Sequence, residues 1–216
     1  MAATILRLSL LTAFFLPTLN MANDRPLTVD DLLALESVGN PQVSPDGQWV
    51  AYTISSRDTE EDKRTTQIWM VSSDGGTPIP MTSAGYSASN PRWSPDNKYL
   101  SFSASKDEDA KSQVWSLNRL GGEAIQVTNV KQGISGFEWS PDGSRLLLII
   151  QDPKASDLTE DKDDDKKPLP HVIDRMQFKR DYVGYLDRRR RHLYVYTPGS
   201  ENQTQLTSGD YDNSDP

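Results

Sequence analysis

The chain has 216 residues and a formal net charge of -8, so it is long enough to bury one sizeable core. The acidic balance argues against nucleic-acid binding, because a phosphate-binding surface needs a surplus of Lys and Arg. Cysteine is absent, which excludes disulfides, thiolate metal sites and a cysteine nucleophile. Two histidines are too few for a zinc site built on several imidazoles. No phosphate-binding loop or dinucleotide-binding glycine motif is present, and we expect neither a metal nor a cofactor.

Residues 1–22 are typical of a signal peptide. Arg7 supplies the positive start, and the apolar run from Leu8 to Leu19 has the length of a signal core and is too short to span a bilayer. Cleavage is expected after Ala22, although Asn20 fits the small-residue rule poorly. The alternative is a buried N-terminal helix. The signal peptide predicts a periplasmic or secreted protein with no membrane segment after its removal.

Residues 23–40 form a lead-in that contains a short helix. The stretch from Leu27 to Leu35 begins with Thr28, a good N-cap, followed by the acidic residues Asp30 and Asp31. An N-cap hydroxyl and negative charge in the first turn both stabilise a helix start.

A turn motif is repeated three times in the rest of the chain. Ser-Pro-Asp-Gly stands at 44–47 and 140–143, and Ser-Pro-Asp-Asn at 94–97, with the serines 50 and 46 residues apart. Proline presets the backbone for the first central position of a type I turn, and glycine or asparagine adopts the left-handed conformation that follows. Strand-like segments flank each copy, so each copy predicts a tight hairpin.

A second hairpin follows each turn motif. An aromatic strand runs through a glycine turn into a short strand that ends in threonine, as in Val114–Leu117, Gly121–Gly122 and Val127–Thr128. Each period therefore holds four antiparallel strands, the content of one propeller blade. We predict an all-β fold, a partial β-propeller over residues 41–216 with blades at about 41–88, 89–134 and 135–211. The alternative is a β-sandwich.

These motifs resemble a known repeat. The pattern Trp-Ser-Pro-Asp-Gly, then Ile-Trp, Gly-Gly and Leu-Thr is similar to the propeller repeat of TolB and of the N-terminal propeller in prolyl oligopeptidase-family serine peptidases, including the acylaminoacyl-peptidase and dipeptidyl-peptidase branches. The resemblance covers nearly everything after residue 25. The helix before the repeats favours the exported peptidases. The resemblance to these peptidases implies a peptide substrate and a C-terminal α/β-hydrolase domain as partner. The alternative is a TolB-like periplasmic propeller that binds protein partners without enzyme activity.

The chain ends where a fourth repeat is expected. Asn213-Ser214-Asp215-Pro216 matches the residues before the earlier repeats, such as Ser89-Asn90-Pro91. Propellers close with four to eight blades, so we expect this chain to be a fragment of a longer protein.

The third blade contains an insertion at 151–192. It opens with a charged run from Asp157 to Lys167. A calcium loop is one interpretation, but the run lacks the glycine and distal glutamate of an EF-hand, and a solvated loop is favoured. The four arginines 188–191 are expected at a solvated edge or a domain contact, with anion binding as the alternative.

The second half of the insertion is similar to a segment of the exported peptidases that reads roughly V-I-x-R-x-x-[FY]-K-x-D-G-x-G-Y. The resemblance implies that four residues contact the peptide substrate: Arg175, Lys179, Asp181 and Tyr185. Arg175 and Lys179 would share a face if the stretch were helical. The alternative is a structural cluster of salt bridges that includes Asp174.

No complete catalytic site is expected in the chain. A serine hydrolase of this class needs a G-x-S-x-G elbow on a strand-to-helix turn. The nearest match, Gly85-Tyr86-Ser87-Ala88-Ser89, ends in serine and lies in a loop between repeats. In the family that the chain resembles, the catalytic triad lies in the hydrolase domain.

Overall fold

The computed structural model describes residues 25–59, 62–107, 110–154, 173, 176–181, 184–200 and 203–213. The expected signal peptide at 1–22 and the charged run from Asp157 to Lys167 lie outside these residues.

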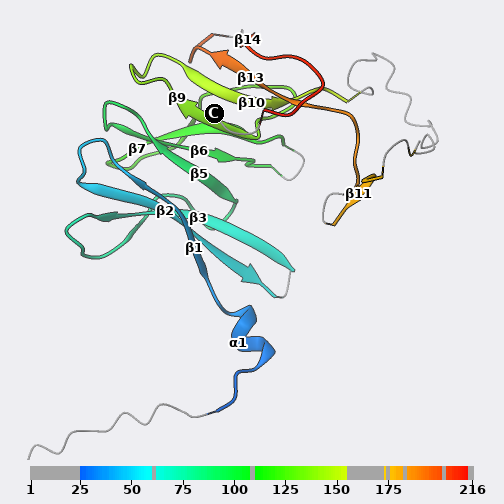
Figure 1. Cartoon of the computed structure of the whole chain (residues 1–216). Coiled ribbons are helices and arrows are strands. Elements are labelled where there is room, and N and C mark those ends of the chain that lie inside the picture. The colour runs from blue at the N-terminus through cyan, green and yellow to red at the C-terminus, as the bar shows by residue number, and fades with distance from the viewer. Residues whose placement is uncertain are drawn as a thin grey trace, which may run out of the picture.

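Three four-stranded antiparallel sheets follow one another along the chain and stack face to face (Figure 1). The first contains β1 (Ser37–Val43), β2 (Trp49–Asp58), β3 (Lys63–Ser72) and β4 (Ile79–Pro80). The second contains β5 (Ala88–Trp93), β6 (Tyr99–Ala104), β7 (Gln113–Asn118) and β8 (Ile125–Gln126). The third contains β9 (Gly136–Trp139), β10 (Leu146–Gln151), β13 (Arg191–Tyr196) and β14 (Gln203–Gln205). In each sheet the strands lie in chain order, which confirms the predicted all-β architecture of four-stranded blades.

The three repeated turns each join the first two strands of a sheet, as predicted. A backbone bond of 2.8–3.0 Å closes each turn, and Gly47, Asn97 and Gly143 follow with φ values of 71°, 61° and 70°. The turn serine bonds the aspartate two residues later and accepts a bond from the backbone N–H five residues later. The sequence Ser-Pro-Asp therefore carries a local hydrogen-bond network that holds each turn.

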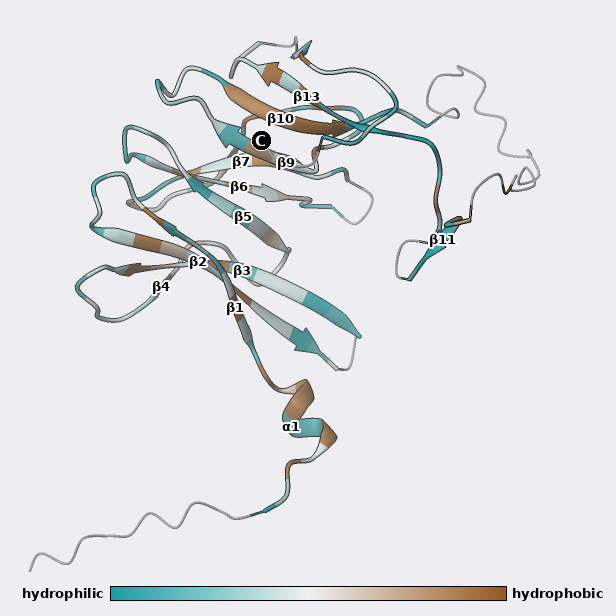
Figure 2. Ribbon diagram, viewed as in Figure 1, coloured by the Kyte–Doolittle hydropathy of each residue, from teal (hydrophilic) through white to brown (hydrophobic). Residues whose placement is uncertain are grey.

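The short helix α1 (Val29–Leu33) begins where the sequence predicts. Thr28 and Asp31 form a capping box, and the ion pair with Arg25, together with the bonds from Thr28, lowers the pKa of the Asp31 carboxyl. The helix lies away from the sheets (Figure 2), and its Val29 and Leu32 side chains are exposed. No helix in the described part of the chain is long and apolar enough to cross a membrane.

Two hydrophobic cores lie between the sheets. The core between the first and second sheets contains Ile68, Leu100 and Phe102, and the core between the second and third contains Val114 and Phe137. The second sheet contributes to both cores, so it is buried on both faces. Figure 2 shows the apolar colouring along β10, whose alternate residues enter the second core.

Polar bonds also join neighbouring sheets. The Trp93 indole N–H donates to the Gln42 carbonyl at 3.0 Å, and the Arg92 guanidinium pairs with Glu138 at 2.6 Å. The turns themselves are joined, because the Asp46 N–H donates to the Asn97 side chain at 3.0 Å.

The turn aspartates make stability depend on pH. Bonds from Ser140 and Ser144 lower the pKa of Asp142 from 3.8 to about 2, and equivalent bonds lower the pKa of Asp46 and Asp96. A carboxyl with a lowered folded-state pKa stabilises the fold above its unfolded pKa and loses this contribution as the pH falls through the folded value. We therefore expect the free energy of unfolding to fall between about pH 4 and about pH 2.

Urea unfolding of Asp142→Asn measures how much one turn contributes to the pH dependence of the free energy of unfolding. The variant is expected to be less stable at neutral pH and to lose less stability than the wild type on acidification. Asp74→Asn, in a glycine turn, serves as the control for the removal of one exposed carboxylate. Identical pH dependence for Asp142→Asn and the wild type would contradict the prediction.

Gly133, in the connection from the second to the third sheet, is predicted to be required for close packing. Its φ is +78°, and an added Cβ would lie 2.8 Å from the Lys111 Cβ and 3.1 Å from the Ser112 carbonyl oxygen. Gly122 has φ +110° with open space around it. We expect Gly122→Ala to lose about 1–2 kcal/mol from backbone strain, and Gly133→Ala to lose a further ~1–3 kcal/mol from overpacking. Equal losses of unfolding free energy in the two variants would show that small shifts of Lys111 and Ser112 relieve the contact with the added Cβ at little cost in free energy.

Candidate functional site

The loops that join the second and third strands of the three sheets lie at one end of the stack, which we call the loop end (Figure 1). The repeated Ser-Pro-Asp turns lie at the opposite end. This separation follows from antiparallel pairing, because successive connections in a meander alternate between the two ends. The insertion takes the place of one such loop, since it connects β10 to β13. It therefore emerges at the loop end, next to the loop 105–112 of the second sheet.

The insertion contains a small hairpin that carries three of the four residues expected to bind substrate. Strand β11 (Lys179–Arg180) pairs with β12 (Gly184–Tyr185), with Lys179 opposite Tyr185 and Asp181 at the turn. The Lys179 ammonium lies 5.8 Å from the centre of the Tyr185 ring, which stacks on Phe178 at 6.3 Å. All of these side chains are exposed, and the hairpin projects from the sheets (Figure 1).

The helical arrangement considered for this stretch is wrong at Lys179, which lies in a strand. The pairing of Lys179 with Tyr185 across two antiparallel strands, together with the contact between the Phe178 and Tyr185 rings, favours a hairpin over a helix here. Arg175 and Asp174 lie outside the described residues, so the structure brings together Lys179 and Tyr185 and does not place Arg175.

The root of the insertion is held closed by a network of charged residues. The Asp152 N–H donates to the Arg190 carbonyl at 2.8 Å, and the Arg190 N–H donates back to the Asp152 carboxylate at 3.0 Å. The Arg190 guanidinium bonds Asp210 at 2.8 Å and lies 3.9 Å from Asp212. Arg189 bonds Asp187 at 2.5 Å. In the four-arginine run 188–191, the Arg189 side chain thus pairs with the nearby Asp187. The Arg190 side chain pairs with Asp210 and Asp212, which are distant in sequence.

His192 is buried behind this network. Its side chain is 4% exposed, its Nε2 lies 3.7 Å from Asp152, and its Nδ1 has no hydrogen-bond partner in the described structure. The first two sheets have Gln67 and Gln113 at this position. The Gln113 carboxamide accepts bonds from Thr128 and Val130 and donates to the Val130 carbonyl. The third sheet therefore departs from the repeat at the base of its insertion.

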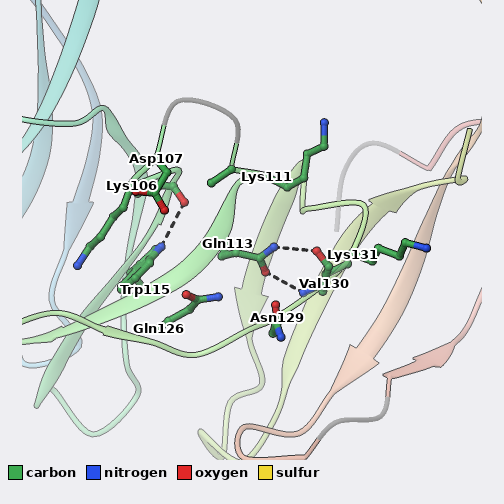
Figure 3. Close-up of a pocket in the computed structure, with 11 residues that line it drawn as sticks. Lys106, Asp107, Lys111, Gln113, Trp115, Gln126, Asn129, Val130 and Lys131 are labelled. Atoms are coloured by element: carbon green, nitrogen blue, oxygen red, sulfur yellow. Dashed lines mark hydrogen bonds between the residues drawn. The ribbon is translucent and has the colours of Figure 1, made fainter. Parts of the chain in front are cut away.

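A hollow of about 290 Å³ opens beside the loop 105–112 (Figure 3). Its lining combines polar and apolar surface and comes from the second sheet, its loop and the connection to the third sheet: Ala104, Lys106, Asp107, Ala110, Lys111, Gln113, Trp115, Gln126, Asn129, Val130 and Lys131. No sequence pattern pointed to this hollow, because its lysines come from two different connections, Lys106 and Lys111 after β6 and Lys131 after β8.

One cation of the hollow is held over aromatic rings. The Lys106 ammonium lies 3.8 Å from the centre of the Trp115 ring and 5.6 Å from that of Tyr86. The Trp115 ring is itself fixed, because its indole N–H donates to the Ala104 carbonyl at 3.2 Å. Such a cation–π contact restrains a side chain that is otherwise flexible.

The serine of the elbow-like sequence has a structural role. The Ser87 Oγ accepts a 2.9 Å bond from the Thr66 N–H, which ties the connection after the first sheet to β3.

Among the described residues no three His, Asp or Glu side chains are placed to hold a metal ion.

Comparison with known proteins finds similarity to peptidases. No protein-family model matches it. It is 31% identical over 190 residues to the uncharacterized peptidase YuxL of Bacillus subtilis, covering 88% of this chain and 29% of that protein. The chain thus spans less than a third of that curated relative.

Two solved structures share the fold. An acylaminoacyl peptidase from Pyrococcus horikoshii superposes with a TM-score of 0.60 at 22% identity, over 81% of this chain and 26% of that one. A putative TolB from Agrobacterium tumefaciens gives a TM-score of 0.50 at 16% identity, over 83% and 54% of the two chains. The chain is therefore similar in sequence to a bacterial peptidase and in fold to peptidase and TolB structures, which confirms the resemblance to prolyl oligopeptidase-type propellers with TolB-like repeats.

Proposed function

We propose that this chain is the non-catalytic propeller portion of an exported serine peptidase, whose hydrolase domain lies elsewhere in a longer protein. The observation that carries the proposal is the 31% identity to a peptidase of which the chain spans 29%. The propeller would act as a wall and a filter that admits short or flexible peptides to a separate catalytic domain. The export signal expected at residues 1–22 places that protein in the periplasm or outside the cell.

Among the described residues no sheet covers the outer face of the third sheet, which supports a longer protein. Leu147 and Val195 lie opposite each other on this face, are only half-buried and line part of a hollow of about 300 Å³. The corresponding face of the second sheet is covered by the third and forms a hydrophobic core. A further sheet packed on Leu147 and Val195 would bury them in the same way.

The charge and exposure of the insertion hairpin support a role in peptide binding. Lys179 and Tyr185 lie side by side on a projecting hairpin at the loop end, with Asp181 at its turn. Backbone edges, one cation and one aromatic face are the groups that bind an extended peptide. Arg175 belongs to the same proposed site on the strength of the sequence resemblance.

The reading frame beyond Pro216 separates this proposal from a TolB-like binding protein. A G-x-S-x-G motif within a later α/β region would support the peptidase. A stop codon soon after the remaining blades would overturn it.

The chain alone is predicted to be inactive as a hydrolase. Ser87 is bonded to the backbone of Thr66, and the buried imidazole of His192 faces Asp152 with no serine bonded to it in the described structure. Purified residues 23–216 should not react with a serine-directed fluorophosphonate probe. Labelling that disappears in the Ser87→Ala variant would contradict the prediction.

In the full-length protein, Lys179→Ala and Arg175→Ala are each predicted to raise KM for short peptides. A hydrogen bond to a charged group is worth ~1.5–3 kcal/mol, which corresponds to roughly a tenfold or larger change. The thermal midpoint should stay nearly unchanged, because Lys179 is exposed. Lys98→Ala, at the opposite end of the second sheet, is the control. Loss of stability with an unchanged KM would show that the cluster is structural.

A further inference from the structure

The chain contains three Asp-Gly pairs, and each lies in a turn. They stand at Asp46-Gly47, Asp74-Gly75 and Asp142-Gly143. In such a pair the glycine nitrogen can attack the carboxyl group of the aspartate side chain, because glycine has no Cβ to restrict its backbone. The first and third pairs belong to Ser-Pro-Asp turns, whereas the second forms the glycine turn between β3 and β4. The three pairs therefore offer the same chemistry in different surroundings.

The Asp142 carboxylate is held by its own turn. The Ser140 hydroxyl donates to one oxygen at 2.6 Å, the Ser144 N–H donates to the same oxygen at 3.0 Å, and the Ser144 hydroxyl lies 2.8 Å from both oxygens. These bonds lower the pKa of Asp142 from 3.8 to about 2. At neutral pH its protonated form is therefore roughly 60-fold rarer than that of a carboxyl with the ordinary pKa. The protonated form is the one that an amide nitrogen attacks, because the hydroxyl can then leave as water.

The Asp46 carboxylate is held in the same way. It accepts bonds from the Ser44 hydroxyl at 2.5 Å and from the Gln48 N–H at 3.1 Å. Its second oxygen pairs with the Arg119 guanidinium at 3.1 Å. The bonds from Ser44 and Gln48, with the charge of Arg119, lower the pKa of Asp46. Both Ser-Pro-Asp turns thus fix their carboxylates and favour the ionised form.

Asp74 lacks this support. Its side chain is exposed, and within the described part of the chain its carboxylate has no hydrogen bond or ion pair. The bond in this turn that resembles those of the Ser-Pro-Asp turns runs the other way, because the Asp74 N–H donates to the Ser72 hydroxyl at 3.2 Å. The carboxyl group of Asp74 is therefore free to rotate towards the following peptide nitrogen.

The backbone around Asp74 has room to rearrange. Gly75 and Gly76 have φ values of +90° and +117°, and no other atom lies within 4 Å of a Cβ built on either. Strand β4 is held beyond the turn, because the Met81 N–H donates to the Ile68 carbonyl at 2.8 Å and the Ile68 N–H donates to the Thr82 hydroxyl at 2.9 Å. The turn can therefore change its backbone while β4 stays in place.

The attacking nitrogen is bonded alike in all three turns. The Gly75 N–H donates to the Ser72 carbonyl at 2.9 Å, and the N–H groups of Gly47 and Gly143 donate to the equivalent carbonyls at 2.8 Å. These bonds slow the reaction to a similar extent in each turn. The state of the carboxylate is then the feature that distinguishes the three pairs.

We propose that Asp74 is a site of isoaspartate formation, and that the Ser-Pro-Asp turns protect Asp46 and Asp142 from the same reaction. The Gly75 nitrogen forms a bond to the Asp74 Cγ, and the N–H proton and the carboxyl hydroxyl leave as water, which gives a cyclic succinimide. Water then adds to the main-chain carbonyl carbon of Asp74 and breaks its bond to the Gly75 nitrogen. The chain now continues through the side chain, and the α-carboxylate is free. Water is the only co-reactant, and the reaction does not depend on the proposed peptidase function.

The test incubates the full chain in its folded state at neutral pH and physiological temperature and samples it over weeks. Trypsin releases the three aspartates in different peptides, because Arg57 and Arg92 separate them, and electron-transfer fragmentation distinguishes isoaspartate from aspartate in each. We expect isoaspartate to form at Asp74 at least about tenfold faster than at Asp142, whose protonated form is suppressed. Equal rates at the two positions in the folded chain would overturn the proposal.

The same incubation in urea separates the effect of the fold from that of the local sequence. The bonds that protect Asp46 and Asp142 exist only in the folded chain, so the three rates are expected to converge when the chain is unfolded. A preference for Asp74 that is as strong in urea as in the folded chain would refute the protective role of the turns.

Two variants test the two halves of the proposal. Asp74→Glu keeps the charge but would need a six-membered ring, so methylation of the aged chain by an isoaspartyl methyltransferase with S-adenosylmethionine should fall nearly to background. Ser140→Ala with Ser144→Ala removes both hydroxyls from Asp142 and should raise isoaspartate there several-fold, with Asp46 in the same molecule as the control. Ser144→Ala alone keeps the Ser140 bond and replaces the double variant if circular dichroism shows that the latter is unfolded. Unchanged methylation in Asp74→Glu, or an unchanged rate at Asp142 in a folded serine variant, would overturn the corresponding half.

Discussion

Burial of both faces of a sheet is the constraint on which the rest of the structure depends. The second sheet sends Val114 into one core and Phe102 into the other, so it is stable only between two neighbours. Apolar burial contributes about 25 cal/mol per Å², and a four-stranded sheet with two apolar faces gains this only by stacking. Hydrogen bonds between sheets, such as the one from the Trp93 indole to the Gln42 carbonyl, are directional, whereas apolar burial is not. They therefore help to fix the orientation of one sheet relative to the next.

Stacking of antiparallel sheets also determines where function can lie. Because all connections of one kind gather at one end, the insertion and the hollow beside Trp115 share the loop end although they come from different sheets. The turn end carries the repeated Ser-Pro-Asp network, whose groups are bonded to one another. The connections at the loop end differ more in length from sheet to sheet, and binding residues are usually found in such variable loops on a rigid scaffold.

The two ends of the insertion are bonded to each other where they leave the third sheet. Asp152 and Arg190 bond each other across its base, and Arg190 also bonds Asp210 from the segment after β14. The hairpin with Lys179 and Tyr185 therefore projects from a closed root. His192, in the place of the glutamine found in the other two sheets, packs against this root and marks the point where the third repeat diverges.

The sequence by itself determined the local elements: the helix start at Thr28, the three Ser-Pro-Asp turns and the four strands of each repeat. These features depend on bonds between residues a few positions apart, so a short stretch of sequence contains the whole cause. Of the candidate site, the sequence indicated Lys179, Asp181 and Tyr185 by resemblance but not the hairpin that pairs Lys179 with Tyr185. Only the tertiary structure decided that Lys106 lies over Trp115, that Arg190 bonds Asp210, and that the hollow and the insertion share one end. Those contacts join residues of different strands and connections, so they form only once the antiparallel strands have paired in register.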